Sequence, residues 1–168
     1  SFINEKKPLG TIGSLGLIKN KLNKTFFVTN CDILVDCDYF NLLNFHQKNK
    51  FDMTIVAVKK EYKLPYGNCI INSKDLLIRI EEKPKYKFLV NTGLYLFEPK
   101  ILKLIKKNII LDFDQLVKNV QKNKLKIGIF SVKNEQWYDV GQWSEYIKTY
   151  NSLKLRIFLI LKSIKMYF

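Results

Sequence analysis

The sequence feature that most constrains the fold is an apolar run that ends beside a carboxylate. Residues 26–28, Phe-Phe-Val, have the composition expected of a strand buried on both faces of a parallel sheet. Asp32 follows shortly after this run. In open α/β sheets ligands bind outside the carboxyl ends of the strands, so Asp32 is a candidate ligand for a hard cation such as Mg²⁺. On the local pattern alone, Asp32 could instead cap the next turn.

Apolar and amphipathic segments alternate further along the chain, which indicates an α/β fold. An amphipathic helix is predicted over residues 39–49, with Phe40, Leu43 and His46 along one side, followed by a second buried strand over residues 53–58. These elements complete a β–α–β unit. We interpret His46, the sole histidine, as a residue on the helix surface rather than a catalyst.

A strand predicted over residues 89–97 carries a polar interruption at Asn91, Thr92 and Gly93. Such residues inside a strand often mark a place where a ligand approaches the backbone. Between residues 66 and 97 we expect a more antiparallel insertion. The remaining elements are predicted as strands over residues 68–72, 76–80 and 124–132 and as helices over residues 15–22, 99–107, 112–122 and 142–150.

The formal charge of +14 raises the question of an anionic partner. Nearly all cations are lysines scattered along the chain, with arginine only at Arg79 and Arg156. Proteins that read nucleic acids favour arginine for bidentate contacts, and no common binding-module signature is visible. We therefore predict a solvated lysine-rich surface and no nucleic-acid partner.

Cysteine spacing and hydropathy bound the compartment and the domain organisation. Cys31, Cys37 and Cys69 have neither zinc-ligand nor disulfide-framework spacing, which favours a reducing cytoplasm. The apolar stretch at residues 157–168 is far shorter than the roughly 20 residues that span a membrane, so no membrane span is predicted. We expect one domain over residues 1–150 and a basic, apolar helix over residues 151–168, whose role is left open.

Six short motifs follow one another in a fixed order: E-x-x-P-L-G-T-x-G, N-x-D after an apolar strand, P-Y-G, E-K-P, N-T-G and W-x-D-x-G. This order resembles the sugar-phosphate nucleotidyltransferases, which join a nucleoside triphosphate to a sugar 1-phosphate and release pyrophosphate. It is most similar to the guanylyltransferases that act on hexose or heptose 1-phosphates for surface-glycan precursors. The resemblance spans about residues 5–150 and implies a Rossmann-like mixed sheet of the nucleotide-diphospho-sugar transferase type.

The resemblance also implies roles for individual residues. Asp32 and Asp139 match the family's two metal aspartates, which would together hold one Mg²⁺. Lys83 matches the lysine that neutralises the sugar phosphate. The other residues implied at the substrate site are Leu9, Gly10, Thr11, Gly13, Tyr66, Gly67, Glu82, Asn91, Thr92 and Gly93.

One part of the family pattern is absent from the chain. The glycine-rich loop, G-G-x-G-T-R-L, cradles the triphosphate and should lie upstream of Glu5. We therefore expect an N-terminally truncated domain that lacks its first strand and this loop, leaves a strand edge exposed, and is inactive by itself. The nucleotide base, the sugar and the formation of a homo-oligomer are left open.

Two rival hypotheses remain from the sequence. Asp36 and Asp38 form a D-x-D pattern, which glycosyltransferases use to hold a metal and a nucleotide sugar, although both residues could simply cap the helix at residues 39–49. The chain could also be a non-catalytic subunit that binds a sugar phosphate or a partner without turnover.

Overall fold

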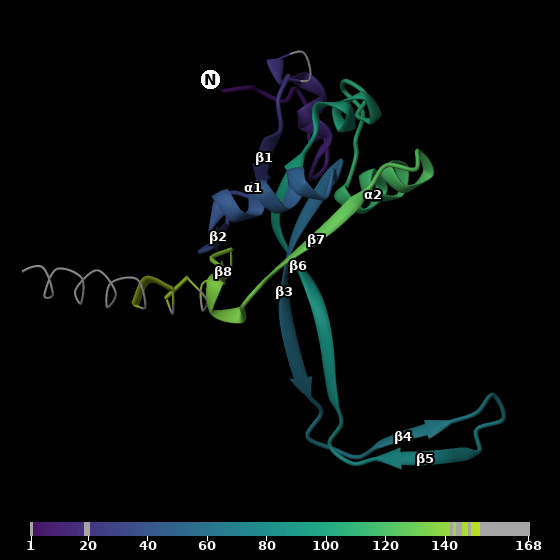
Figure 1. The fold of residues 1–168 in the computed structure, drawn as a ribbon. Coiled ribbons are helices and arrows are strands. Elements are labelled where there is room, and N and C mark those ends of the chain that lie inside the picture. The colour runs from purple at the N-terminus through teal and green to yellow at the C-terminus, as the bar shows by residue number, and fades with distance from the viewer. Residues whose placement is uncertain (1, 19–20, 142, 144–145, 148, 152–168) are drawn as a thin grey trace, which may run out of the picture.

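The computed structural model describes residues 2–18, 21–141, 143, 146–147 and 149–151 (Figure 1). Its centre is a four-stranded sheet in the order β1-β6-β3-β7. Strands β1 (Phe26–Thr29) and β3 (Met53–Lys63) both pair antiparallel with β6 (Lys85–Phe97), whereas β7 (Ile127–Val132) runs parallel to β3. The predicted mixed α/β architecture is confirmed. In the β–α–β unit the two strands run in the same direction, but β6 lies between them.

Two smaller antiparallel sheets complete the strand pattern. Strand β2 (Ile33–Val35) pairs with β8 (Trp137–Asp139), and β4 (Asn68–Ile71) pairs with β5 (Leu77–Glu81). The β4–β5 pair is a hairpin carried between β3 and β6. This confirms the antiparallel insertion expected between residues 66 and 97.

The described part of the chain contains the α-helices α1 (Tyr39–Lys48) and α2 (Phe113–Lys122). It also contains the short 3₁₀ helices η1 (Gly13–Leu17), η3 (Pro99–Leu104) and η4 (Asn134–Gln136). The helices predicted over residues 15–22 and 99–107 are represented by shorter 3₁₀ helices, η1 and η3, and residues 19–20 of the first range lie outside the described residues. η3 ends because Ile105 takes an extended conformation. No helix among the described residues is long and apolar enough to cross a membrane.

The C-terminal predictions fall largely on residues that the structure does not describe. In the helix predicted over residues 142–150, residues 142, 144, 145 and 148 lie outside the described residues, and the described ones from residue 143 onward are helical. Residues 152–168 of the expected terminal helix also lie outside the described residues.

Strand β1 is not buried on both faces, so that prediction is wrong. Its residues alternate between half-buried and exposed, and β6 is its one neighbour among the described residues. Phe26 packs edge-on against Phe97 in the core, whereas the side chain of Phe27 is 42% exposed and packs against Tyr39. Strand β1 therefore has the alternating pattern of an edge strand, and its other edge is unpaired within the described part of the chain.

Helix α1 faces the sheet with part of the predicted side, since Leu43 packs against the core but Phe40 does not. Leu42 and His46, one turn apart, are fully buried, whereas Phe40 is 72% exposed. The interpretation of His46 as a surface residue is therefore wrong. Its two ring nitrogens lie 2.7 Å from Thr54 Oγ1 and 3.2 Å from Glu98 Oε1, and these partners make burial of a polar ring acceptable.

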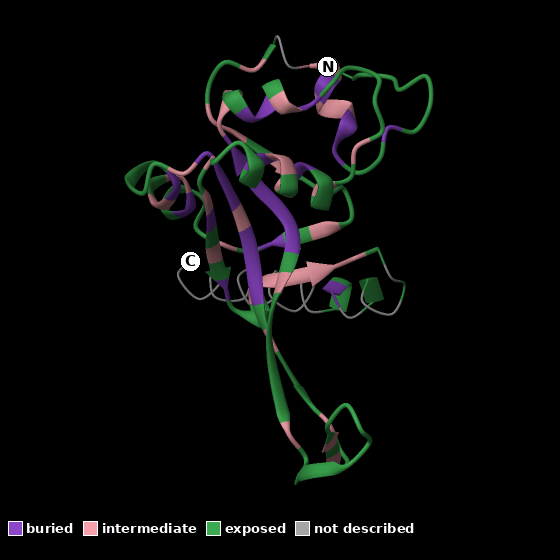
Figure 2. Cartoon of the chain, turned by 90° about the vertical axis from the view of Figure 1, so that its right-hand side faces the viewer, coloured by how far each residue is buried: buried purple, intermediate pink, exposed green. Residues whose placement is uncertain are grey.

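The core lies on both faces of β6 because its side chains alternate. Tyr95 and Phe97 pack with η3 and α2, whereas Leu94 and Leu96 pack with α1 and β2 on the opposite face. Figure 2 shows the strands buried where they cross the body of the molecule and exposed beyond it. There the ends of β3 and β6 form a two-stranded ribbon that carries the β4–β5 hairpin.

A buried carboxylate joins the start of β3 to the start of β7. Asp52 donates its N–H to the Lys126 carbonyl (2.9 Å) and accepts the Lys126 N–H at Oδ2 (2.7 Å), and it forms an ion pair with Lys100. Burial opposes ionisation of this carboxyl, but the hydrogen bonds from Lys100 and Lys126 outweigh burial. The pKa of Asp52 is therefore lowered from its ordinary value.

We predict that Asp52→Asn lowers the free energy of unfolding at pH 7 by about 1.5–3 kcal/mol, the range for hydrogen bonds to charged groups. Because folding lowers the pKa of Asp52, its contribution is present above the ordinary carboxyl pKa and is lost as the pH falls through the folded value. The stability difference between the variant and the parent in urea unfolding should therefore begin to shrink below about pH 4 and vanish only below the folded pKa of Asp52.

The matched control for this prediction is Asp114→Asn, which removes an exposed carboxylate paired with Lys118. It should change stability much less at pH 7. A stability loss for Asp52→Asn that is equal at pH 7 and pH 3 would contradict the prediction.

Candidate functional site

The two aspartates singled out in the sequence lie together in the structure. Asp32 belongs to the loop between β1 and β2, and Asp139 ends β8. The β2–β8 pairing sets Ile33 opposite Asp139, and the Val140 N–H donates to the Asp32 carbonyl (2.9 Å). Backbone pairing therefore holds two residues that are far apart in the sequence side by side.

The carboxylates of both residues face the backbone of Gly141. A β-carbon added at Gly141 would lie 2.9 Å from Asp32 Oδ2 and 3.3 Å from Asp139 Oδ1. The Gly141 N–H also donates to Asp139 Oδ1 (3.1 Å), which fixes that side chain. Asp32 is exposed and Asp139 is half-buried, and one oxygen of each carboxylate faces the position of the missing Gly141 side chain.

This donor set fits Mg²⁺, which proteins usually bind through one or two carboxylates together with substrate phosphates and water. A closed all-protein cage is not present: among the described residues, no group of three or more His, Cys, Asp or Glu side chains could hold a metal ion.

The loop that carries Asp32 is also anchored at its start. The Asn30 N–H donates to the Gly93 carbonyl (3.0 Å). Gly93 has φ +87°, and a β-carbon there would lie 2.9 Å from Asn30 Nδ2. Glycine is therefore required at residue 93 both by its backbone conformation and by the closeness of Asn30.

A bulge in β6 places Gly93 at this point. The β3–β6 register moves from Ile55 opposite Tyr95 to Ala57 opposite Asn91, so residues 92–94 lie opposite Val56 alone. The polar interruption at Asn91, Thr92 and Gly93 is therefore a β-bulge, and the approach of a ligand to the backbone there stays a prediction.

The polar side chains of the bulge have partners within the protein. Thr92 is 2% exposed, and its hydroxyl donates to the Val56 carbonyl (2.9 Å). The Trp137 indole N–H donates to the Thr92 carbonyl (3.2 Å). Asn91 accepts the Gly93 N–H (3.0 Å) and donates to the Tyr95 hydroxyl (2.9 Å). Thr92 and Asn91 therefore support the loop anchor, and a substrate contact by Thr92 is prevented by burial.

The glycine segment near the N-terminus, residues 9–13, packs against the backbone of another segment. A β-carbon at Gly10 would lie 2.7 Å from the Leu111 carbonyl oxygen, and one at Gly13 would lie 2.7 Å from the Ile109 carbonyl oxygen. Leu9 is buried, and its carbonyl accepts the Leu111 N–H (2.9 Å). These glycines allow two backbone segments to approach closely.

Thr11 belongs to the N-terminal cap of α2. Its N–H donates to Asp112 Oδ1 (3.1 Å), and its hydroxyl accepts the Phe113 N–H (3.0 Å). Figure 1 shows this segment beside η3 and α2, away from β2 and β8. The structure therefore does not bring Leu9, Gly10, Thr11 and Gly13 to the aspartate pair.

Four further predicted residues cluster around the base of the β4–β5 hairpin. A β-carbon at Gly67 would lie 3.1 Å from Glu82 Oε2, and Lys83 Nζ lies 4.0 Å from Glu82 Oε1. Lys83 has φ +45°, and Tyr66 is exposed. This hairpin base lies at the far end of the β3–β6 ribbon from the aspartates, so the structure brings these residues together but not to Asp32 and Asp139.

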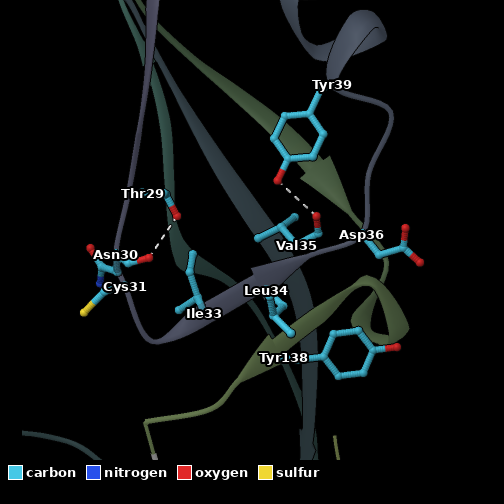
Figure 3. Close-up of a pocket in the computed structure, with 9 residues that line it drawn as sticks. All are labelled: Thr29, Asn30, Cys31, Ile33, Leu34, Val35, Asp36, Tyr39 and Tyr138. Atoms are coloured by element: carbon cyan, nitrogen blue, oxygen red, sulfur yellow. Dashed lines mark hydrogen bonds between the residues drawn. The ribbon is translucent and has the colours of Figure 1, made fainter. Parts of the chain in front are cut away.

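A pocket of about 630 Å³ lies beside the Asp32 loop (Figure 3). It is bounded by the end of β1, by β2 and by the start of α1, where the Tyr39 hydroxyl donates to the Val35 carbonyl (3.2 Å). Burial, and then the nearby Cys37 and Asp36, raise the pKa of Tyr39, so the phenol stays a neutral donor. Cys31 and Ile33 line the pocket but Asp32 does not, so the pocket lies next to the carboxylate pair rather than over it.

The D-x-D pattern has a structural explanation at its second residue. The Asp38 side chain accepts the Asn41 N–H (3.0 Å) and caps α1. The Asp36 backbone is held to Gln136 at both its N–H (2.7 Å) and its carbonyl (2.7 Å). These contacts favour the interpretation of Asp38 as a helix cap over a metal ligand.

Sequence reasoning missed two residues that shape the site. Asn30 holds the Asp32 loop through its backbone bond to Gly93. Gly141 faces the carboxylates of Asp32 and Asp139. Both lie inside motifs recognised in the sequence, N-x-D and W-x-D-x-G, so the signal was present. Their roles depend on contacts between distant segments, which the sequence does not give.

Comparison with known proteins identifies one family over nearly the whole chain. The family described as nucleotidyl transferase matches residues 1–155. Mannose-1-phosphate guanyltransferase 2 of Candida glabrata is 33% identical over 156 residues, which cover 88% of this chain. The mannose-1-phosphate guanylyltransferase catalytic subunit beta of Danio rerio is 29% identical over 164 residues. The chain spans 42% of the length of each of these two relatives.

Solved structures with a similar fold agree with this assignment. HddC from Yersinia pseudotuberculosis is 25% identical and aligns with a TM-score of 0.59 over 88% of this chain and 64% of its own. A putative glucose-1-phosphate thymidylyltransferase from Bacillus anthracis, 20% identical, aligns with a TM-score of 0.61 over 90% of this chain and 63% of its own. The second likeness shows the fold alone, and it confirms the predicted sheet type.

We predict that Thr92→Val lowers the free energy of unfolding by about 1–3 kcal/mol, because it leaves the buried Val56 carbonyl without its donor. Chemical denaturation at neutral pH measures this effect. The matched control is Thr29→Val, which removes an exposed hydroxyl bonded to the Asn30 carbonyl and should change stability by less than about 0.5 kcal/mol. Equal stability of Thr92→Val and the parent would show that the hydroxyl does not support the bulge.

Proposed function

The chain belongs to the nucleotidyl transferase family, and from this premise we propose that the protein joins a nucleoside triphosphate to a sugar 1-phosphate and releases pyrophosphate. The observation that carries this proposal is the convergence of Asp32 and Asp139 beside Gly141. We further propose GTP and a hexose 1-phosphate as substrates, because relatives about one third identical are mannose-1-phosphate guanyltransferases. The product would be a nucleotide sugar for glycan synthesis, made in the cytoplasm.

In this reaction an oxygen of the sugar phosphate attacks the α-phosphorus of the triphosphate, and the bond to the pyrophosphate oxygen breaks. The residues near the α-phosphorus must position two anions, the triphosphate and the sugar phosphate, and must offset the negative charge on their oxygens. Asp32 and Asp139 would hold Mg²⁺, which when bound supplies positive charge to the phosphate oxygens. The backbone bond from Val140 to Asp32 holds the two segments side by side, and the bond from the Gly141 N–H orients the Asp139 carboxylate before a cation arrives.

Lys83 and Glu82 are assigned to the sugar-phosphate end of the reaction. The lysine would act as a mobile point charge for the phosphate, and the glutamate would accept hydrogen bonds from sugar hydroxyls. Both side chains are exposed, at 57% and 71% respectively. Lys83 and Glu82 lie at the far end of the β3–β6 ribbon from the two aspartates. All four residues would therefore act in the same turnover only when the β4–β5 hairpin moves towards β2 and β8.

The nucleotide end is assigned to the exposed part of the glycine segment. Gly10 and Thr11 are exposed although Leu9 and Gly13 are buried. Since the Thr11 hydroxyl and N–H are engaged with the cap of α2, recognition of the base falls to the exposed backbone around Gly10.

We predict that Asp32→Asn and Asp139→Asn each lower pyrophosphate release by about a hundredfold or more, because charge stabilisation by a bound metal is worth several kcal/mol. The assay offers GTP, CTP, UTP and dTTP against a panel of sugar 1-phosphates with Mg²⁺. It is run on the 168-residue chain and on any longer protein that contains it.

The matched control is Glu135→Gln, which removes an exposed carboxylate in η4, outside the site. It should leave turnover unchanged. Turnover that survives both aspartate substitutions would contradict the assignment of the metal ligands. Hydrolysis of a nucleotide sugar without any need for pyrophosphate would favour the glycosyltransferase hypothesis. No turnover with any pair of substrates, from a folded protein that carries the glycine-rich loop, would favour a non-catalytic protein or a glycosyltransferase.

A further inference from the structure

Gly141 occupies a position where the backbone does not require glycine. Its φ lies outside the left-handed region, unlike those of Gly10 and Gly93, so alanine can adopt the same conformation without strain. Gly141 is also exposed, so close packing in the core does not explain it. The reason for glycine must lie in what surrounds its missing side chain.

The atoms around that missing side chain belong to the two candidate metal ligands. A β-carbon at Gly141 would meet Asp32 Oδ2 at 2.9 Å, Asp139 Oδ1 at 3.3 Å and Asp32 Cγ at 3.4 Å. The first distance is too short for a carbon–oxygen contact, so the Asp32 carboxylate would have to move. Asp32 is exposed and can rotate, whereas Asp139 is held by the Gly141 N–H.

We propose that Gly141 is a positioning residue for a divalent cation, an inference that rests on the function proposed above. The absence of a side chain lets the Asp32 carboxylate lie against the 139–141 turn, where its Oδ2 faces the same point as Asp139 Oδ1. It also leaves space for the water and phosphate oxygens that Mg²⁺ retains when only two carboxylates bind it. Any β-carbon at residue 141 turns Asp32 away and fills part of that space.

The test is Gly141→Ala on the full chain, with Mn²⁺ as the probe and no nucleotide present. Electron paramagnetic resonance of free Mn²⁺ gives the affinity, and competition by Mg²⁺ gives the affinity for that ion. We expect Mn²⁺ binding to weaken about tenfold or more, in the range for losing an interaction that orients metal ligands. The thermal midpoint of the metal-free variant should equal that of the parent, because the side chain that moves is an exposed carboxylate.

The control variants separate the cation site from general charge. Asp32→Asn and Asp139→Asn should weaken Mn²⁺ binding at least as much as Gly141→Ala, whereas Glu135→Gln should leave it unchanged. The inference is overturned when Gly141→Ala binds Mn²⁺ like the parent or when the parent binds no Mn²⁺. A fall in the metal-free thermal midpoint of Gly141→Ala also overturns it, because the residue is then structural.

This experiment is independent of the assay for nucleotidyl transfer. Weaker Mn²⁺ binding by Gly141→Ala, together with no turnover in a longer protein that carries the glycine-rich loop, would support the positioning role and contradict the proposed function. Turnover together with unchanged Mn²⁺ binding by Gly141→Ala would support the function and contradict the positioning role alone.

Discussion

The bulge in β6 is the constraint on which the candidate site depends. Its two extra residues leave backbone and side-chain groups that the β-ladder does not use, and three different segments take them up. Thr92 bonds to Val56 in β3 and to the Trp137 indole at the start of β8, while the Gly93 carbonyl receives the Asn30 N–H. One irregularity therefore fixes the loop after β1 and the strand that carries Asp139 relative to the centre of the sheet.

The sequence predicted the positions of the strands of the central sheet better than their exposure, and it did not predict β2 and β8 as strands. The run at residues 26–28 was correctly predicted as a strand, but nothing in three apolar residues distinguishes an edge strand with one buried face from a fully buried one. The same limit applies to His46. Periodicity placed it on a helix, but its burial depends on Thr54 and Glu98, which reach it from other parts of the chain.

The candidate site was predictable to the extent that its residues share a local motif. Asp32 and Asp139 were paired through the ordered motifs, and the β2–β8 ladder confirms that they lie together. Lys83 belongs to an equally clear motif, but its distance from the aspartates is set by the direction of the β3–β6 ribbon. The order of the motifs indicates which residues are expected to take part in the same reaction. It does not indicate how far apart those residues lie in a given conformation.

The glycines show why identical residues in recognised motifs have different physical roles. At Gly10 and Gly13 the nearest atoms to a missing β-carbon are backbone carbonyl oxygens, which cannot move without moving the chain. At Gly93 and Gly141 they are the side chains of Asn30 and Asp32. The first kind of contact joins two stretches of backbone and belongs to the fold. The second kind determines where the side chains of Asn30 and Asp32 lie. The contacts at Gly93 and Gly141, and not those of the N-terminal glycines, therefore belong to the candidate site.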